Sequence, residues 1–306
     1  RRRSRCEPLL LIPVLSPAAS RTPGMALDFE STHPVILRSV LAITDFSGHG
    51  DKALSRAALL CAEHGATLRL VCLASSHDAV PLDMPRRLAH HALQLGQRHR
   101  IRAHASSRVA MSVEDIVPQA RHADLLVWGT SAARGARALI LGQPVEAVLR
   151  QVRRPVLGAR RKGTDAFRRG PVAGGFSAAS RRLVELGLAL NRSADVELFH
   201  AISTANEGKL RYAEVSEQAI RAYRHECRRH AQDRMFWLTD SYDARRNRVQ
   251  SAIGHGDAAR QAVVQQQHGG AELIVVGKHP ASLVTDVLFG SVAARVLRQA
   301  HADVLV

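Results

Sequence analysis

The chain has only four cysteines in 306 residues, which excludes a dense disulfide framework. They are Cys6, Cys61, Cys72 and Cys227, and no two of them have the C-x-x-C spacing of a zinc or redox site. Long apolar runs are also missing, since no stretch approaches the roughly 18 unbroken apolar residues of a membrane span. We therefore expect a cytoplasmic protein with buried, reduced thiols and no membrane partner.

Aromatic residues make up 4% of the chain, too few for a platform that stacks single-stranded bases. The formal net charge of +16 comes almost entirely from arginine, and lysine occurs only at Lys52, Lys162, Lys209 and Lys278. This excess fits compositional bias at least as well as polyanion binding, so we do not expect a nucleic-acid partner. The sixteen histidines form no H-E-x-x-H pair, and we expect no metal site.

The N-terminal residues differ from the rest of the chain. The stretch RRRSRCEPLLLIPVLSPAASRTPG has a basic head and a short apolar run that Pro8 and Pro13 interrupt. It is only loosely similar to a secretory signal. We interpret residues 1–30 as an extension that is disordered or not native, with Met25 as the natural start.

The remainder of the chain is an internal duplication. DLLVWGTSAARGARALILGQPVEAVLRQVRRPVL, from Asp124, aligns without gaps with ELIVVGKHPASLVTDVLFGSVAARVLRQAHADVL, from Glu272, and roughly a third of the positions are identical. The region from Ala42 parallels the region from Val172 in the same way. We expect two domains, residues 34–160 and 170–306, joined by a charged linker at 161–169.

Each half alternates short runs rich in valine, leucine and isoleucine with longer segments of helical period, which predicts βαβ units and a parallel sheet. In the first half the predicted strands are 36–44, 67–74, 101–109, 124–129 and 155–159. The predicted helices there are 51–64, with Ser47 or Asp51 as its cap, 84–98, 112–121 and 144–151. In the second half the predicted strands are 171–175, 195–202, 247–253, 272–277 and 303–306.

One longer helix is predicted over 208–238 in the second half. Its apolar residues follow a spacing of three and four: Ile220, Tyr223, Cys227, Ala231, Met235 and Leu238. Such a stripe is typical of core packing, because a helix must bury one face.

Both halves carry glycines after the fourth predicted strand. In parallel sheets, ligands bind beyond the carboxyl ends of strands where the strand order reverses. Glycine lets the backbone approach a phosphate there, and the N-terminus of the next helix offers free N–H groups. Gly277, Gly290 and Ser291 fit this description, with Val292 beside them.

Both halves resemble universal stress protein domains, most specifically in ELIVVGKHPASLVTDVLFGSVAARVLRQAHADVLV. The resemblance implies two tandem Rossmann-like domains of the adenine nucleotide alpha hydrolase-like fold, each with a five-stranded parallel sheet flanked by helices. Nucleotide-binding members of the family carry G-x2-G-x9-G-[ST] after the fourth strand and an aspartate at the end of the first. In this family the last strands of two domains commonly pair at a sheet edge, which implies an intramolecular pseudo-dimer here and leaves a further homodimer open.

Neither half matches this motif completely. In the second half Gly277, Gly290 and Ser291 match, whereas Pro280 stands where the second glycine belongs. Proline has no N–H to donate and cannot adopt a positive φ.

In the first half the glycine positions Gly129 and Gly142 match, but Ala132 replaces the second glycine and Gln143 replaces the hydroxyl residue. Asp45 matches the aspartate that family members direct at the nucleoside. The second half has Gly175 at that position.

The leading interpretation is therefore a non-enzymatic stress-response protein that binds ATP or another adenine nucleotide, mainly in its second half, and has unknown protein partners. The alternative is an interaction or regulatory module that no longer binds nucleotide. The same glycines can serve only as turn and helix-start residues, with Ser291 as an N-cap and Asp45 as a turn former. A nucleotide-hydrolysing enzyme is disfavoured because no general base and no P-loop lysine accompany the glycines.

Overall fold

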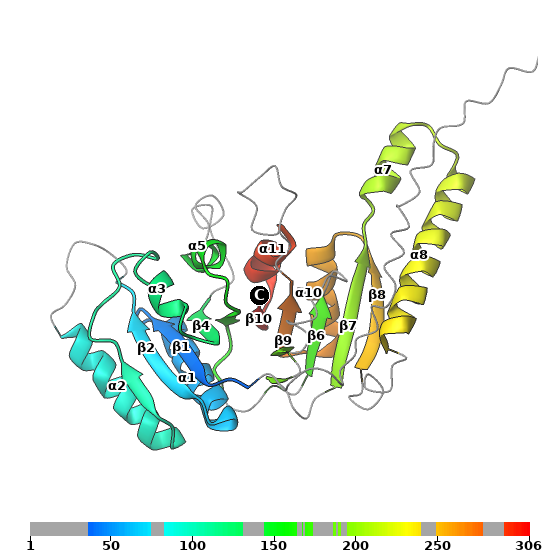
Figure 1. Cartoon of the computed structure of the whole chain (residues 1–306). Helices are drawn as coiled ribbons and strands as arrows, with labels where there is room; N and C mark the ends of the chain where they lie inside the picture. Colours follow the sequence, from blue (N-terminus) through cyan, green and yellow to red (C-terminus); the bar gives the residue numbers. More distant parts are fainter. Residues whose placement is uncertain are drawn as a thin grey trace, which may run out of the picture.

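A computed structural model describes residues 36–74, 83–130, 144–163, 167, 169–173, 186–187, 189–190, 195–239, 249–277 and 291–306. Within them, ten strands form a single sheet in the order β3-β2-β1-β4-β5-β10-β9-β6-β7-β8. In chain order these strands are β1 (Ser39–Thr44), β2 (Thr67–Cys72), β3 (Ala103–Ala105), β4 (Leu125–Gly129), β5 (Val156–Ala159), β6 (Arg169–Ala173), β7 (Asp195–Ile202), β8 (Val249–His255), β9 (Leu273–Val276) and β10 (Asp303–Leu305). The sheet runs across the whole molecule (Figure 1).

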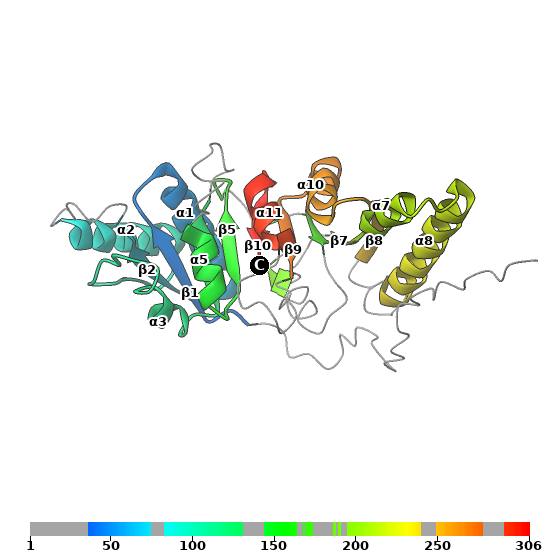
Figure 2. The same ribbon diagram turned by 90° about the horizontal axis from the view of Figure 1, so that it is seen from above.

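Helices cover both faces of this sheet (Figures 1 and 2). In chain order they are α1 (Gly48–His64), α2 (Met84–His99), α3 (Val117–Ala120), α5 (Pro144–Gln151), α7 (Ala205–Tyr212), α8 (Glu217–Thr239), α10 (Ala258–Gly269) and α11 (Ser291–Gln299). Residues of α1, α2 and α8 belong to the core on one face, and residues of α3, α5, α10 and α11 belong to the core on the other. The fold is thus a three-layer α/β/α arrangement.

The two halves have the same strand order, which confirms the predicted duplication of an α/β fold. From the outer edge to the centre, the first half reads third, second, first, fourth and fifth strand, and the second half repeats this order from the opposite edge. Strands within each half are parallel, whereas β5 and β10 pair antiparallel, with Val304 opposite Gly158. This pairing joins two five-stranded parallel sheets into one, so neither central edge strand is left open.

Strand residues alternate between the two cores, as the period of a β-strand requires. Along β1, Val40 and Ala42 point to the face of α1, and Leu41 and Ile43 point to the face of α3 and α5. Both cores contain residues from both halves, so the hydrophobic interior continues across the β5–β10 seam.

The helix predicted over 112–121 is reduced to α3, Val117–Ala120. Pro118 lies at the start of α3, where its missing N–H costs little, but a helix running through from 112 would need that N–H. Upstream, the Asp115 carboxylate accepts the N–H groups of Met111 and Ser112 and stabilises a turn instead.

The helix predicted over 208–238 is divided into α7 and α8. Glu214 has a φ of 55°, which ends α7, and Ser216 Oγ accepts the N–H of Ala219 at the start of α8. Within the predicted apolar stripe, Ile220, Ala231 and Met235 are buried, whereas Tyr223 and Cys227 are half-buried. The Leu238 side chain lies outside the described residues. The strand predicted over 101–109 shortens to β3, because Ser106 Oγ accepts the Arg108 N–H and turns the chain.

The segment predicted as a linker is packed rather than loose where the structure describes it. The Gly163 carbonyl accepts a hydrogen bond from Ser55 Oγ in α1, and Phe167 is 1% exposed. β6 begins at Arg169, the last residue of the predicted linker.

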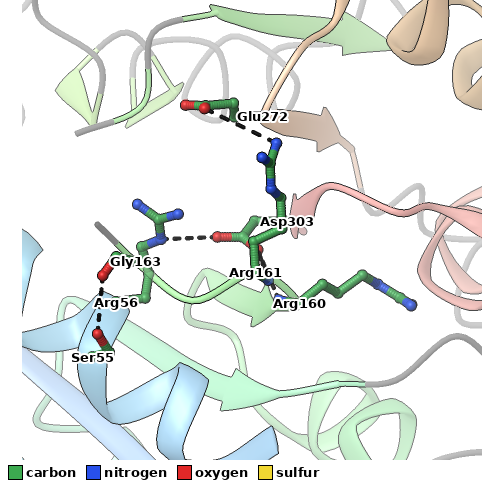
Figure 3. Close-up of polar contacts among 7 residues, drawn as sticks. All are labelled: Ser55, Arg56, Arg160, Arg161, Gly163, Glu272 and Asp303. Atoms are coloured by element: carbon green, nitrogen blue, oxygen red, sulfur yellow. Dashed lines mark hydrogen bonds and ion pairs between the residues drawn. The ribbon is translucent and has the colours of Figure 1, made fainter. Parts of the chain in front are cut away.

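A buried ion pair holds the two halves together at this seam (Figure 3). Arg56 Nε of α1 lies 2.9 Å from Asp303 Oδ2 at the start of β10, and both side chains are almost fully buried. Asp303 Oδ1 accepts the backbone N–H groups of Arg160 and Arg161. Burial raises the pKa of Asp303, while Arg56 and the two N–H groups act in the opposite direction. The Arg56 guanidinium also lies 4.2 Å from the centre of the Phe167 ring.

A second ion pair crosses the seam on the opposite face of the sheet. Arg298 Nε of α11 donates to Glu146 Oε1 in the first turn of α5 over 2.9 Å. The Glu146 side chain is 3% exposed, and Arg298 is its charged partner. The seam therefore combines backbone pairing, apolar packing, one buried ion pair and one partly buried ion pair.

Candidate functional site

The strand order places one reversal point in each half. In the first half the chain passes from β1 to β2 to β3 and then crosses to β4 on the other side of β1, so β1 and β4 flank the reversal. In the second half β6 and β9 are the equivalent neighbours. Ligands of open parallel sheets bind outside the carboxyl ends of such strand pairs. These two places are the candidate sites.

Asp45 lies directly after β1, at the reversal point of the first half. Its Oδ1 atom accepts the Ser47 N–H over 2.9 Å and also a hydrogen bond from Ser47 Oγ. Ser47 is the N-cap of α1 and accepts the N–H groups of His49 and Gly50. Asp45 therefore builds the turn into α1, and its side chain remains exposed at the carboxyl end of β1.

Phe46 adopts a φ of 57°, and Thr44 Oγ1 accepts its N–H. The Arg87 guanidinium lies 4.5 Å from the centre of the Phe46 ring, and the His91 ring lies 5.5 Å from it. Arg87 and His91 are four residues apart on α2, so they share one helix face. We did not predict this cluster from the sequence, because only the fold brings α2 beside the β1 turn.

The thiols of the first half are poor nucleophiles in this environment. Burial raises the pKa of Cys61 to about 12. Burial also raises the pKa of Cys72 to about 11, with a further increase from Asp45 and a smaller opposing effect of Arg87. Thiolates are the reactive form, so neither cysteine is equipped for nucleophilic chemistry at neutral pH.

Gly129 ends β4 beside Asp45, as the predicted motif requires, but packing explains it without a ligand. A Cβ atom at this position would lie 2.0 Å from the carbonyl oxygen of His49 and 2.9 Å from the Gly50 nitrogen. The first turn of α1 passes so close to β4 that only glycine fits.

In the second half, Gly277 follows β9 directly and Ser291 is the first residue of α11. Val292 is half-buried and packs against the core. The structure therefore places the beginning and the end of this glycine motif at a strand end and a helix start. The other predicted positions lie outside the described residues: Gly142, Gly290, Ala132, Gln143, Gly175 and Pro280.

A polar cluster that the sequence analysis missed lies at the carboxyl end of β8. Glu207 of α7 accepts hydrogen bonds from both Arg224 Nε and Nη2, and its Oε1 lies 2.8 Å from His255 Nε2. The hydrogen bond from Arg224 and that with His255 hold the pKa of Glu207 below its ordinary value, although burial opposes them. The cluster ties the α7–α8 segment to the sheet.

Two classes of site have no support in the described part of the chain. No group of three or more His, Cys, Asp and Glu side chains is arranged to hold a metal ion there. None of the helices described is long and apolar enough to cross a bilayer.

The strand order and the two reversal points define a tandem Rossmann-like α/β protein. The model of the Universal stress protein family matches residues 37–160 and again residues 172–306. The chain therefore belongs to the universal stress protein family, with one family domain in each half.

Solved structures share this fold. A universal stress protein from Archaeoglobus fulgidus DSM 4304 aligns with a TM-score of 0.60 and 18% identity, covering 87% of this chain and 94% of that one. A functionally unknown protein from Pseudomonas aeruginosa PAO1 aligns with a TM-score of 0.55 and 18% identity, over 88% and 92% of the two chains. A search of curated proteins found no significant match.

Proposed function

We propose that this protein is a non-enzymatic, cytoplasmic stress-response protein that binds ATP or a related adenine nucleotide mainly in its second half. One observation supports the proposal: Gly277 directly follows β9, which pairs with β6 at the reversal point, and the next described helix, α11, begins at Ser291. A helix N-terminus has unpaired N–H groups and a positive dipole end, and a serine there adds a hydroxyl. These groups suit the phosphates of a nucleotide.

The first half offers a weaker site. It keeps Asp45 at the end of β1, but Gln143 stands where the second half has Ser291. Gly129 is required by the packing of α1, so its presence does not argue for a ligand. Asp45 already accepts two hydrogen bonds from Ser47 at one carboxylate oxygen. We therefore assign the tighter nucleotide site to the second half.

Calorimetric titration of ATP into the wild type and Ser291→Ala tests this assignment. Loss of one hydrogen bond to a charged phosphate weakens binding by about tenfold. Ser216→Ala is the matched control, because Ser216 lies at the start of a different helix, α8, and its loss leaves ATP affinity unchanged. Small molecules released on denaturation of the purified protein are identified in parallel.

Two results would overturn the proposal. Absence of copurified nucleotide together with no binding heat at millimolar ATP would favour a regulatory module that has lost the ligand. Steady ATP turnover above that of a Gly290→Asp variant would contradict the non-enzymatic role.

A further inference from the structure

Arg160 is a buried arginine at the carboxyl end of β5, in the seam between the halves. The residue is 7% exposed, and its backbone N–H donates to Asp303 Oδ1 over 2.7 Å. Figure 3 shows that its side chain extends away from the Arg56–Asp303 pair. Its Nε and Nη2 atoms are buried and have no hydrogen-bond partner in the structure described.

Asp303 does not neutralise the Arg160 side chain by hydrogen bonding. Asp303 Oδ2 bonds Arg56, and Oδ1 accepts the two backbone N–H groups. Burial lowers the pKa of Arg160 to about 10, with Asp303 acting in the opposite direction, so the guanidinium is still charged at neutral pH. Buried charges that lack hydrogen bonds are strongly unfavourable, and native proteins seldom keep them without a partner.

The unpaired atoms lie on one edge of the guanidinium. Nε–H and Nη2–H point in the same direction and form the fork that binds two oxygens of a carboxylate or phosphate. A water molecule offers a single oxygen, whereas an oxyanion offers two oxygens and the opposite charge.

Thr130 supplies a second unpaired polar group, at the end of the neighbouring strand β4. Gly129 pairs with Ala159 in the β4–β5 ladder, and the Thr130 N–H continues it by donating to the Ala159 carbonyl. Thr130 is 3% exposed, and its Oγ1 has no partner within the described structure. This hydroxyl lies 3.2 Å from the place that a Cβ on Gly158 would take, and Gly158 is two residues before Arg160. The Thr130 side chain therefore lies over β5 near the start of the Arg160 backbone.

We propose that Arg160 and Thr130 form a binding site for an oxyanion of the phosphate type at the carboxyl ends of β4 and β5. The guanidinium fork binds two phosphate oxygens, and the threonine hydroxyl donates to one of them. The site lies on the other side of β4 from the β1–β4 reversal point, and it is in the other half from the nucleotide site proposed above. It therefore does not depend on that proposal.

Inorganic phosphate is the first probe, titrated calorimetrically at constant ionic strength with chloride as the balancing anion. Wild type binds phosphate, and Arg160→Met abolishes the binding. Thr130→Val and Arg160→Lys each weaken it by about tenfold, because one loses the hydroxyl and the other keeps the charge but loses the fork. These two milder variants keep the test valid if Arg160→Met does not fold.

Arg161→Met is the matched control. Arg161 is the next residue and shares the Asp303 carboxylate through its backbone, but its side chain is 55% exposed. This variant retains the wild-type phosphate affinity. An equal loss of phosphate affinity in Arg161→Met and Arg160→Met overturns the proposal. So does a wild type that binds neither inorganic phosphate nor, through Arg160, ATP.

Titration of ATP distinguishes the two sources of the phosphate group. If Arg160→Met and Thr130→Val weaken ATP but the wild type ignores inorganic phosphate, the oxyanion is part of a nucleotide in the first half. If inorganic phosphate alone depends on Arg160, the site binds free phosphate. If Arg160→Met changes the affinity for neither inorganic phosphate nor ATP, the proposed site is wrong.

Discussion

The two halves of this protein share a strand order but have diverged at the positions that we propose contact a ligand. The first half keeps Asp45 at the end of its first strand, where the second half has Gly175. The second half keeps Ser291 at the start of its last helix, where the first half has Gln143. A duplicated sheet thus tolerates change at strand ends and helix starts, because these positions contribute little to the core.

The halves differ in the same way at their seam. Arg56 of the first half meets Asp303 of the second, whereas the equivalent positions in the aligned repeats are Leu186 and Pro155. A symmetric seam would carry the charged pair twice. The actual seam carries it once, so each half presents a different surface to the other.

The largest expected effect comes from the glycine that the first half needs for packing. Gly129→Val places a Cβ against the His49 carbonyl and forces α1 away from β4. We expect a loss of about 4 kcal/mol or more in the free energy of unfolding, measured by urea denaturation.

Gly48→Ala is the control for this change. A Cβ on Gly48 meets no atom within 4 Å, so the variant stays within about 0.5 kcal/mol of the wild type. Normal stability of Gly129→Val would show that the motif glycine of the first half is not a packing residue.

A smaller effect is expected when Arg56 at the seam is replaced by leucine, the residue at the equivalent position of the second half, Leu186. Arg56→Leu leaves the buried Asp303 carboxylate without its cation and costs about 3 kcal/mol. Adding Asp303→Asn removes the buried charge and keeps an oxygen for the N–H groups of Arg160 and Arg161. The double variant is therefore more stable than Arg56→Leu alone, in urea unfolding.

Arg161→Leu is the control for these variants. The Arg161 side chain is exposed, so its loss changes the free energy of unfolding by only about 0.5 kcal/mol or less. Simple additivity of Arg56→Leu and Asp303→Asn would show that the pair does not couple the halves.

The smallest effect concerns the Glu207 cluster of the second half. The hydrogen bonds from Arg224 and with His255 lower the pKa of Glu207. Its stabilising contribution is fully present above the ordinary glutamate pKa and is lost as the pH falls through the lowered value. We expect Glu207→Gln to lose about 1 kcal/mol near pH 7, and the difference from wild type to shrink below about pH 4.

Unfolding curves recorded at several pH values measure this difference. Glu226→Gln removes an exposed carboxylate that pairs with Arg229 on α8, and it serves as the matched control with no such pH dependence. A difference between wild type and Glu207→Gln that stays constant with pH would argue against the cluster.

Much of the fold was predictable from the sequence because hydrophobic periodicity reports local structure. The predicted strands 36–44, 124–129 and 272–277 end within one residue of β1, β4 and β9. Errors arose where one side chain redirected the backbone, as at Pro118 in α3 and at the turn before Ser216. Of the candidate site residues, Gly142 and Gly290 lie outside the described residues, so the complete motif stays a prediction.

The sequence by itself determined the duplication, the α/β class and the positions of the glycines, because each of these is a pattern along the chain. The tertiary structure alone decided the antiparallel β5–β10 seam and the meeting of Arg56 with Asp303, which are 247 residues apart. It also decided that Arg160 and Thr130 are buried at neighbouring strand ends, where Arg160 Nε and Nη2 and Thr130 Oγ1 have no hydrogen-bond partner in the part described. Such contacts depend on which strand edges meet in space, and no local pattern encodes that choice.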